Sequence, residues 1–358
     1  MYRRSLLRAG VAAGSSVVIG GCLTSSDFEP LANPSVPEDR PDGSYIPSHV
    51  SGMEMIGMAE QSDYAFGAMY SIPHQFWNVN GTSVSYTDVE NDDDIHLMAS
   101  VWDPETRTVL PETGLSVEIY QNDSLVSQET IYPMLSQRMG FHYGANFELN
   151  GDGEYTVRLS VGAMSIRRSG NFKQRFSEPA TVEIPFEYSH YVKEGLAFER
   201  TEAQPATNGA VNPAYMKMVP DSVAPTQYDL PGTSIGTGMS NDAKLVVAVL
   251  DSPPAGIDGD GQYLAVSART RYNRVLLPAM GLEGTLSRDG DTVYDGAFTR
   301  TLDPELNYHY GAVVDSIESG DRLTLRVTVP PQAARHIGYE SAFGGLMGGM
   351  PDVSITVE

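Results

Sequence analysis

The sequence repeats itself at a constant spacing of 167 residues. His142-Tyr143-Gly144-Ala145 recurs at 309–312, Leu110-Pro111 recurs at 277–278, and Gly114-Leu115 recurs at 281–282. Chance would not keep three such matches in one register, so the spacing indicates that one fold has been duplicated. We therefore expect two copies of a single domain.

Both copies consist of short runs of alternating apolar and polar residues, separated by Gly, Pro, Asn and Asp. Such runs predict strands, and no stretch has the 3.6-residue period of a long amphipathic helix. We predict an all-β fold made of two tandem immunoglobulin-like antiparallel β-sandwich domains. The predicted strands are 64–70, 84–87, 95–102, 115–120, 125–131, 142–149, 155–161 and 181–188 in the first copy, and 244–250, 263–268, 282–286, 291–295, 308–314 and 323–329 in the second.

The residues before the first copy have the pattern of an export signal. Arg3-Arg4, an apolar run as far as Ile19 and then Gly20-Gly21-Cys22 predict a twin-arginine lipoprotein signal over residues 1–22. Cys22 is the only cysteine, so it cannot form an internal disulfide, and we expect it to carry a lipid. The mature chain would then be lipid-anchored at the extracellular face of the cytoplasmic membrane.

Composition divides the rest of the chain. Residues 23–50 are rich in Ser, Pro and Asp without a hydrophobic period, which indicates a flexible tether. Residues 191–240 are rich in Pro, Gly, Ser and Thr, which indicates an interdomain connection. The first sandwich is expected at 51–190 and the second, a degenerate copy, at 241–358.

The chain is strongly acidic, with a formal net charge of −23 over 358 residues. Such a surface repels nucleic acid, so we expect no nucleic-acid partner. Many carboxylates with very few lysines are typical of halophilic proteins, because carboxylates keep a protein hydrated while salt screens their repulsion. An ordinary acidic exported protein is the alternative.

The first copy carries candidate metal ligands that the second copy mostly lacks. His96 and Met98 are two residues apart on a predicted strand, so they face the same side. Met134 lies in a predicted loop that is followed by His142, which opens the next strand. Imidazole and thioether ligands suit copper, Cu(I) especially. Three of the four are replaced at the equivalent positions of the second copy, by Tyr263, Ala265 and Thr301.

Other interpretations of these residues remain open. His142 recurs as His309, so its imidazole could bond a backbone group in both copies while Gly144 permits a bend. Methionines on strands often only fill a core. His74 is either a further ligand or a turn histidine packed on Trp77. Additional methionines form a loose cluster of Met53, Met55, Met58 and Met69.

These motifs also carry a family resemblance. A Met-containing loop followed by HYGAN and a G-x-G-x-Y-T-V strand, together with DIHLMASV at 94–101, resembles the periplasmic iron-transport family, the copper- and iron-binding proteins that accompany iron permeases. The resemblance covers residues 64–188 and implies that the first domain binds copper or iron. Met98 stands where the family's H-x-E motif has Glu, which removes a carboxylate and disfavours iron. The family's histidine after its last signature strand is missing from the first copy, whereas the second copy has His336.

The combined prediction is an exported lipoprotein that binds copper or iron and delivers it to a membrane metal permease. No catalytic motif such as G-x-S-x-G or H-E-x-x-H occurs, so we do not expect an enzyme. The resembled family forms homodimers, and we expect this chain either to do so or to pair its own two domains instead. An adhesion or scaffold protein is the alternative and predicts that the candidate ligands lie far apart. Carbohydrate binding through an exposed row containing Trp77 and Trp102 is a third possibility.

Overall fold

The computed structural model describes residues 36–358, apart from residues 130, 197, 202 and 347–348. The predicted signal at 1–22, Cys22 and the first part of the tether lie outside the described residues. Among the residues that are described, no helix has the length and apolar character needed to cross a membrane.

The first copy is a β-sandwich, as predicted. One sheet has the order β2 (Glu54–Gln61), β3 (Tyr64–Ser71), β6 (Ile95–Trp102), β10 (Gly140–Phe147), β9 (Tyr132–Ser136), β23 (Ala334–Arg335), β4 (Phe76–Asn80) and β5 (Ser83–Thr87). The other has the order β13 (Ala180–Tyr188), β11 (Gly153–Val161), β7 (Ser116–Gln121) and β8 (Ser124–Glu129).

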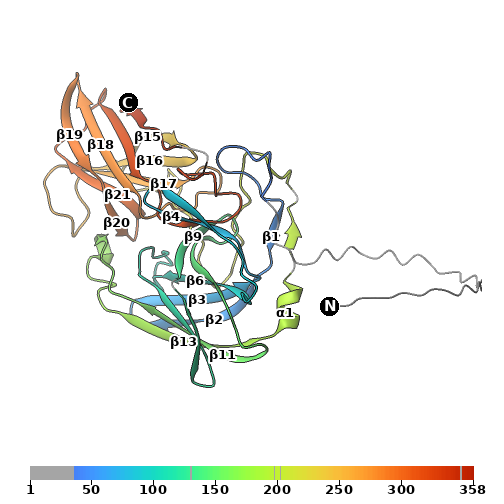
Figure 1. The fold of residues 1–358 in the computed structure, drawn as a ribbon. Coiled ribbons are helices and arrows are strands. Elements are labelled where there is room, and N and C mark those ends of the chain that lie inside the picture. Colours follow the sequence, from blue (N-terminus) through green and yellow to red (C-terminus); the bar gives the residue numbers. More distant parts are fainter. Residues whose placement is uncertain (1–35, 130, 197, 202, 347–348) are drawn as a thin grey trace, which may run out of the picture. The chain divides into compact units, whose positions relative to one another are not determined.

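The second copy is also a β-sandwich, coloured yellow to red in Figure 1. One sheet has the order β12 (Arg167–Arg168), β20 (Thr299–Asp303), β21 (Asn307–Val314), β17 (Gln262–Thr270), β16 (Ala243–Leu250) and β15 (Thr233–Ser240). The other has the order β19 (Asp291–Ala297), β18 (Gly281–Arg288), β22 (Arg322–Val329) and β24 (Val353–Thr356).

The segments outside the sandwiches are less loose than their composition suggests. The connection predicted at 191–240 contains most of helix α1 (His190–Gly195), strand β14 (Phe198–Arg200) and all of β15. Within the first copy, a short 3-10 helix covers Gly170–Phe172. The described end of the predicted tether includes the fully buried Tyr45, and β1 (His49–Ser51) pairs with β14. These stretches contribute only scattered residues, such as Val219 and Leu230, to the hydrophobic clusters, so they show no hydrophobic period.

Strand alternation determines which side chains face each core. β13 alternates strictly between buried and exposed residues, as expected for a sheet with one solvated face. β6 is instead buried at every residue. Because side chains alternate along a strand, Ile95 and Leu97 face one side of the sheet, and His96 and Met98 face the other, which is also buried. A strand buried on both faces can hold polar ligands away from water.

The two copies exchange short strands. β23 lies between β22 and β24 of the second copy in sequence, but between β9 and β4 in the sheet of the first. β12 lies between β11 and β13 of the first copy in sequence, but pairs with β20 of the second. The exchange is symmetric: the His336 amide donates to the Leu135 carbonyl at 3.0 Å, and the Ser169 amide donates to the Leu302 carbonyl at 3.0 Å, each 167 residues away from its counterpart. The tandem domains are therefore joined, and each completes a sheet of the other.

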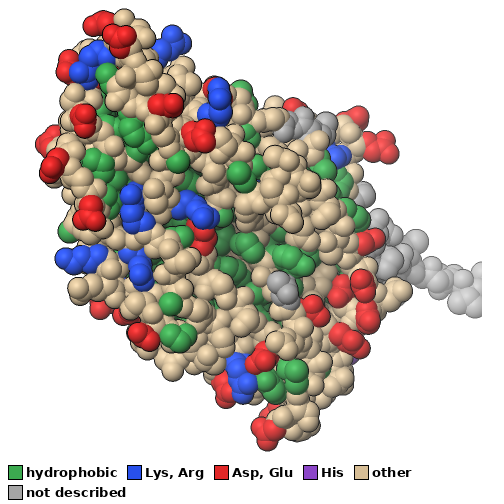
Figure 2. Space-filling model, turned by 60° about the vertical axis from the view of Figure 1, so that its left-hand side comes forward, with side chains coloured by type: hydrophobic (Ala, Val, Ile, Leu, Met, Phe, Trp, Pro, Cys, Tyr) green, Lys and Arg blue, Asp and Glu red, His purple; other side chains and the backbone are tan. Residues whose placement is uncertain are grey.

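The acidic residues are distributed over the surface. Figure 2 shows Asp and Glu side chains spread over much of the face in view, with apolar side chains visible between them. On the face in view, the acidic side chains do not form one continuous patch.

Candidate metal centre

Three neighbouring strands and one exchanged strand bring the candidate ligands together. Met134 on β9 lies directly opposite His142 on β10 and also beside Ala334 on β23. His336 follows β23 immediately, and His96 lies on β6, the other neighbour of β10. The sequence predicts a loop at Met134, but the structure has a strand there. β9 contains a proline and is held by its pairing with β10 and β23, so its own residues give little strand signal.

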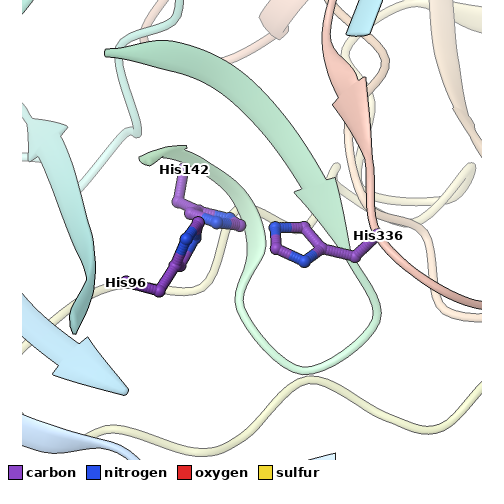
Figure 3. A group of neighbouring side chains, drawn as sticks. All are labelled: His96, His142 and His336. Carbon is purple, nitrogen blue, oxygen red and sulfur yellow. The ribbon is translucent and has the colours of Figure 1, made fainter. Parts of the chain in front are cut away.

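Three imidazoles converge on one point (Figure 3). One ring nitrogen each of His96, His142 and His336 lies within 4.8 Å of the others. The Met134 Sδ atom lies 3.3 Å from His336 Nε2. Three nitrogens that bind one ion at about 2.0–2.1 Å in tetrahedral or trigonal geometry are about 3.3–3.6 Å apart, so the widest pair needs to close by up to about 1.5 Å to hold a metal.

Two of these nitrogens are buried without a partner. His96 Nε2 and His142 Nε2 have no hydrogen-bond partner anywhere in the described part of the chain. A buried polar atom left in this state costs about 1–3 kcal/mol. A bound cation would satisfy both atoms at once.

The other ring nitrogens are held by hydrogen bonds. His96 Nδ1 lies 2.8 Å from Asn146 Oδ1, and His142 Nδ1 lies 3.2 Å from the Gly140 carbonyl. Because both partners accept hydrogen bonds, each Nδ1 carries the proton and each Nε2 presents its lone pair to the centre.

Asn146 itself is fixed by two further contacts. Its Nδ2 group donates to the His74 carbonyl at 3.0 Å and to Asp93 Oδ2 at 3.1 Å. These bonds determine which end of the amide faces His96, and so they set the tautomer of that imidazole.

Burial keeps the imidazoles neutral. It lowers the pKa of His96 to about 4 and that of His142 to about 3, the latter with a contribution from nearby His96. Burial and the neighbouring histidines hold the pKa values of His74 and His336 well below the usual 6.5. Neutral imidazole is the form that binds metals, so the centre is ready for an ion at neutral pH.

Gly144 makes room for the centre. A Cβ atom at this position would lie 2.8 Å from Met134 Sδ and 2.9 Å from His96 Nε2. Its backbone does not have a positive φ, so the predicted bend is not the reason for glycine here. The reason is the close approach of the ligands.

The two remaining candidates lie beside the cluster. The ring of His74 is centred 5.0 Å from that of His96 and 5.4 Å from that of His336, and its Nε2 contacts Ser71 Oγ at 3.1 Å. Met98 lines a cavity of about 90 Å³ together with His74, His142 and His336. This cavity is large enough for several waters. His74 and Met98 are thus placed to line an approach to the centre.

Burial and packing also test the expectations for His74 and Trp77, for carbohydrate binding and for a scaffold without a metal site. Trp77 packs against Tyr86 and not against His74. Trp77 is 6% exposed and Trp102 is 4% exposed, so they form no exposed aromatic row for a carbohydrate. The convergence of three histidines within 4.8 Å also contradicts the separation that a pure scaffold predicts.

His336 is the ligand that the first copy alone could not reveal. The sequence contains the signal, a histidine in the second copy that matches the resembled family's pattern, but only the strand exchange places it in the centre of the first copy. Asn146 was also visible within HYGAN, although its role as a holder of His96 depends on the register between β10 and β6.

The equivalent place in the second copy contains an arginine in place of a metal centre. The Arg167 guanidinium donates to Thr301 Oγ1 at 2.8 Å, to the Tyr263 hydroxyl at 3.0 Å and to the Gly311 carbonyl at 2.9 Å. The Tyr263 hydroxyl also lies 2.9 Å from His309 Nε2. Thr301, Tyr263 and His309 are the counterparts of Met134, His96 and His142.

Comparison with known families assigns the chain. Residues 57–184 and 228–356, which make up more than half of the chain, match a family described as a domain of unknown function (DUF7350). The chain belongs to this family. Each sandwich is one DUF7350 domain, which confirms the duplication predicted from the sequence. No curated protein sequence matches the chain.

Solved structures show a more distant likeness. A copper-bound variant of FetP from uropathogenic Escherichia coli strain F11 is 20% identical, with a TM-score of 0.29, over 38% of this chain and 97% of that one. Copper-reconstituted P19 from Campylobacter jejuni is 19% identical, with a TM-score of 0.28, over 38% of this chain and 96% of that one. At these TM-scores the likeness does not decide what the DUF7350 domains bind. The evidence for a metal centre is therefore the geometry of the side chains in this chain.

Proposed function

We propose that this protein is an exported lipoprotein that binds one copper ion through His96, Met134, His142 and His336 and delivers it to a membrane uptake system. The observation that carries the proposal is the convergence of two buried, unpartnered imidazole nitrogens with a third imidazole and a thioether. No other arrangement in the described chain leaves two such lone pairs facing one point.

The donor set favours copper over iron. All four proposed ligands are neutral, and within the described part of the chain no carboxylate belongs to the cluster of three histidines. Thioether and imidazole donors suit Cu(I), whereas hard ions such as Fe(III) and Mg²⁺ prefer oxygen ligands. Iron is therefore the weaker candidate.

The cellular role follows from the N-terminal sequence and from the exchange of strands. The twin-arginine pattern and Cys22 support a lipid anchor outside the cytoplasmic membrane, where a permease would receive the ion. The two joined domains within one chain take the place of a homodimer, because the second copy already supplies His336. A carrier of this kind needs no catalytic residues.

Metal titration of the mature chain tests the proposal. We expect Cu(I) to bind in one tight equivalent, and expect His96→Ala or Met134→Ala to weaken binding by more than about 100-fold, because even outer-shell changes cost 10–100-fold. His190→Ala, which removes an exposed histidine on α1, is the matched control and should bind as the unchanged chain does. Equal affinity in the His96, Met134 and His190 variants would overturn the proposal. Tighter binding of Fe(II) than of Cu(I) would reassign the ion.

A further inference from the structure

A row of methionines crosses the first sheet and ends at the metal centre. Met55 on β2 lies directly opposite Met69 on β3, which lies opposite Met98 on β6, which lies opposite Gly144 on β10. Directly paired residues of antiparallel strands point to the same face, with their Cβ atoms about 4.5–5.5 Å apart. The three thioethers therefore lead, strand by strand, to the glycine beneath the metal ligands.

The second copy has the same row without sulfur. Its four positions are paired in the same way across β15, β16, β17 and β21, and they are occupied by Ser234, Ala248, Ala265 and Gly311. The fold thus forms with small side chains at these positions and does not require methionine. Methionines occupy this row in the copy with the histidine cluster and are absent from the same row in the other copy.

The row runs from a partly open edge to the buried centre. β2 is the edge strand of its sheet and Met55 is half-buried, whereas Met69 and Met98 are 1% and 3% exposed. The half-buried Met53 lines the 90 Å³ cavity together with Met98, His142 and His336. Among the described residues of that lining, Arg138 is the one Lys, Arg, Asp or Glu side chain. In a chain of net charge −23, this approach offers soft neutral donors and no carboxylate.

We infer that Met53, Met55, Met69 and Met98 form a path of thioether ligands along which Cu(I) enters and leaves the centre. The inference rests on the proposed copper function and adds a route to it. Thioethers bind Cu(I) in preference to hard cations, and single thioethers hold it weakly enough to release it. The ion passes by exchange of one sulfur ligand for the next, without a change of oxidation state.

The rate of copper transfer tests the path. The full chain is loaded with Cu(I) without oxygen and mixed with a chromophoric Cu(I) chelator, and both uptake and release are followed. The triple variant with Met55→Leu, Met69→Leu and Met98→Leu keeps the side-chain volume and removes the sulfur. We expect transfer to slow at least about tenfold, which is about 1.4 kcal/mol in the barrier, while the equilibrium affinity changes less than about threefold. Met280→Leu, at a buried methionine of the second copy, is the matched control and should leave the rate unchanged.

The possible outcomes separate the two proposals. Unchanged rates in the triple variant would show that the methionines only fill space, and would overturn the path while leaving the centre intact. An unchanged chain that takes up no Cu(I) would overturn the proposed function, and the path with it. If the triple variant does not fold, the single variants Met69→Leu and Met98→Leu carry the same comparison, judged against the same control.

Discussion

The two copies differ at the same point of one fold: the first has a histidine cluster there, and the second has the Arg167 guanidinium. In the first copy, His96 Nε2 and His142 Nε2 are buried without a partner, beside His336 and Met134. In the second copy, Tyr263 and Thr301 replace His96 and Met134, and the Arg167 guanidinium fills the position with its own positive charge. The first copy needs an ion from outside to satisfy its polar atoms, whereas the second is already satisfied.

The difference shows how a duplicated domain can lose a site and keep its fold. His309 and Gly311 remain in the second copy, where His309 Nε2 is bonded to the Tyr263 hydroxyl and the Gly311 carbonyl is bonded to Arg167. Most buried polar groups in proteins have partners, and in the second copy these partners are side chains of the chain itself. One of these partners, Arg167, comes from the exchanged strand β12, just as His336 follows the exchanged strand β23.

The most direct test of whether the two positions are equivalent is to rebuild the proposed ligands in the second copy. The variant that carries Tyr263→His, Thr301→Met, Ser169→His and Arg167→Ala copies the ligands of the first copy onto the same scaffold. We expect the number of tight Cu(I) equivalents to rise from one to two, measured by competition with a chelator. Arg167→Ala alone is the control and should still bind one. A rebuilt variant that folds and binds one equivalent would show that the two positions are not equivalent.

The glycines of the two copies provide the next largest contrast. In Gly144→Ala the new methyl group would occupy the space between Met134 and His96, so we expect Cu(I) affinity to fall more than about 100-fold, as for loss of a ligand. The backbone at Gly144 accepts alanine, so the fold should persist, as circular dichroism would show. Gly311→Ala would instead press on the Tyr263 hydroxyl, which should lower the free energy of unfolding and leave Cu(I) binding in place. Retained copper affinity in Gly144→Ala would contradict the close-packed centre.

Loss of the Tyr263 hydroxyl and loss of the His96 imidazole, at equivalent positions of the two copies, should have different effects. Tyr263→Phe removes the partner of His309 Nε2 and one acceptor of Arg167, so we expect the free energy of unfolding to fall by about 1–3 kcal/mol with no change in Cu(I) affinity. His96→Phe, at the equivalent position of the first copy, should abolish tight Cu(I) binding. Urea unfolding and chelator competition measure the two effects. A loss of copper affinity in Tyr263→Phe would show that the second copy contributes to binding.

The smallest expected effect concerns the lowered histidine pKa, which the two copies share. Burial lowers the pKa of His309 to about 4, as it does for His96. An unfolded histidine takes up its proton near pH 6.5 and these folded ones do so near pH 4, so stability is complete above pH 6.5 and is lost as pH falls through this interval. Each histidine adds a slope of up to about 1.4 kcal/mol per pH unit. His309→Gln should reduce the slope of the unfolding free energy by that amount between pH 6 and 4.5, and an unchanged slope would contradict the buried neutral imidazole.

The sequence by itself determined the repeat, the strands and most of the ligands. The 167-residue spacing revealed two copies, and the alternation along 95–102 placed His96 and Met98 on one face, because in a strand the side-chain direction depends only on neighbouring residues. Every run predicted as a strand contains one in the structure. Local patterns of this kind can be read without knowledge of the rest of the molecule.

Only the tertiary structure decided that His336 joins the cluster and that the second copy has no equivalent cluster among its described residues. β12 and β23 have two residues each, too few to show any period, and each pairs with a strand of the other copy. Met134 and His336 are 202 residues apart in the chain and 3.3 Å apart in the fold. They are brought together by the pairing of strands that are distant in the chain. The free energy of this pairing depends on both strands, so it cannot be predicted from either local stretch alone.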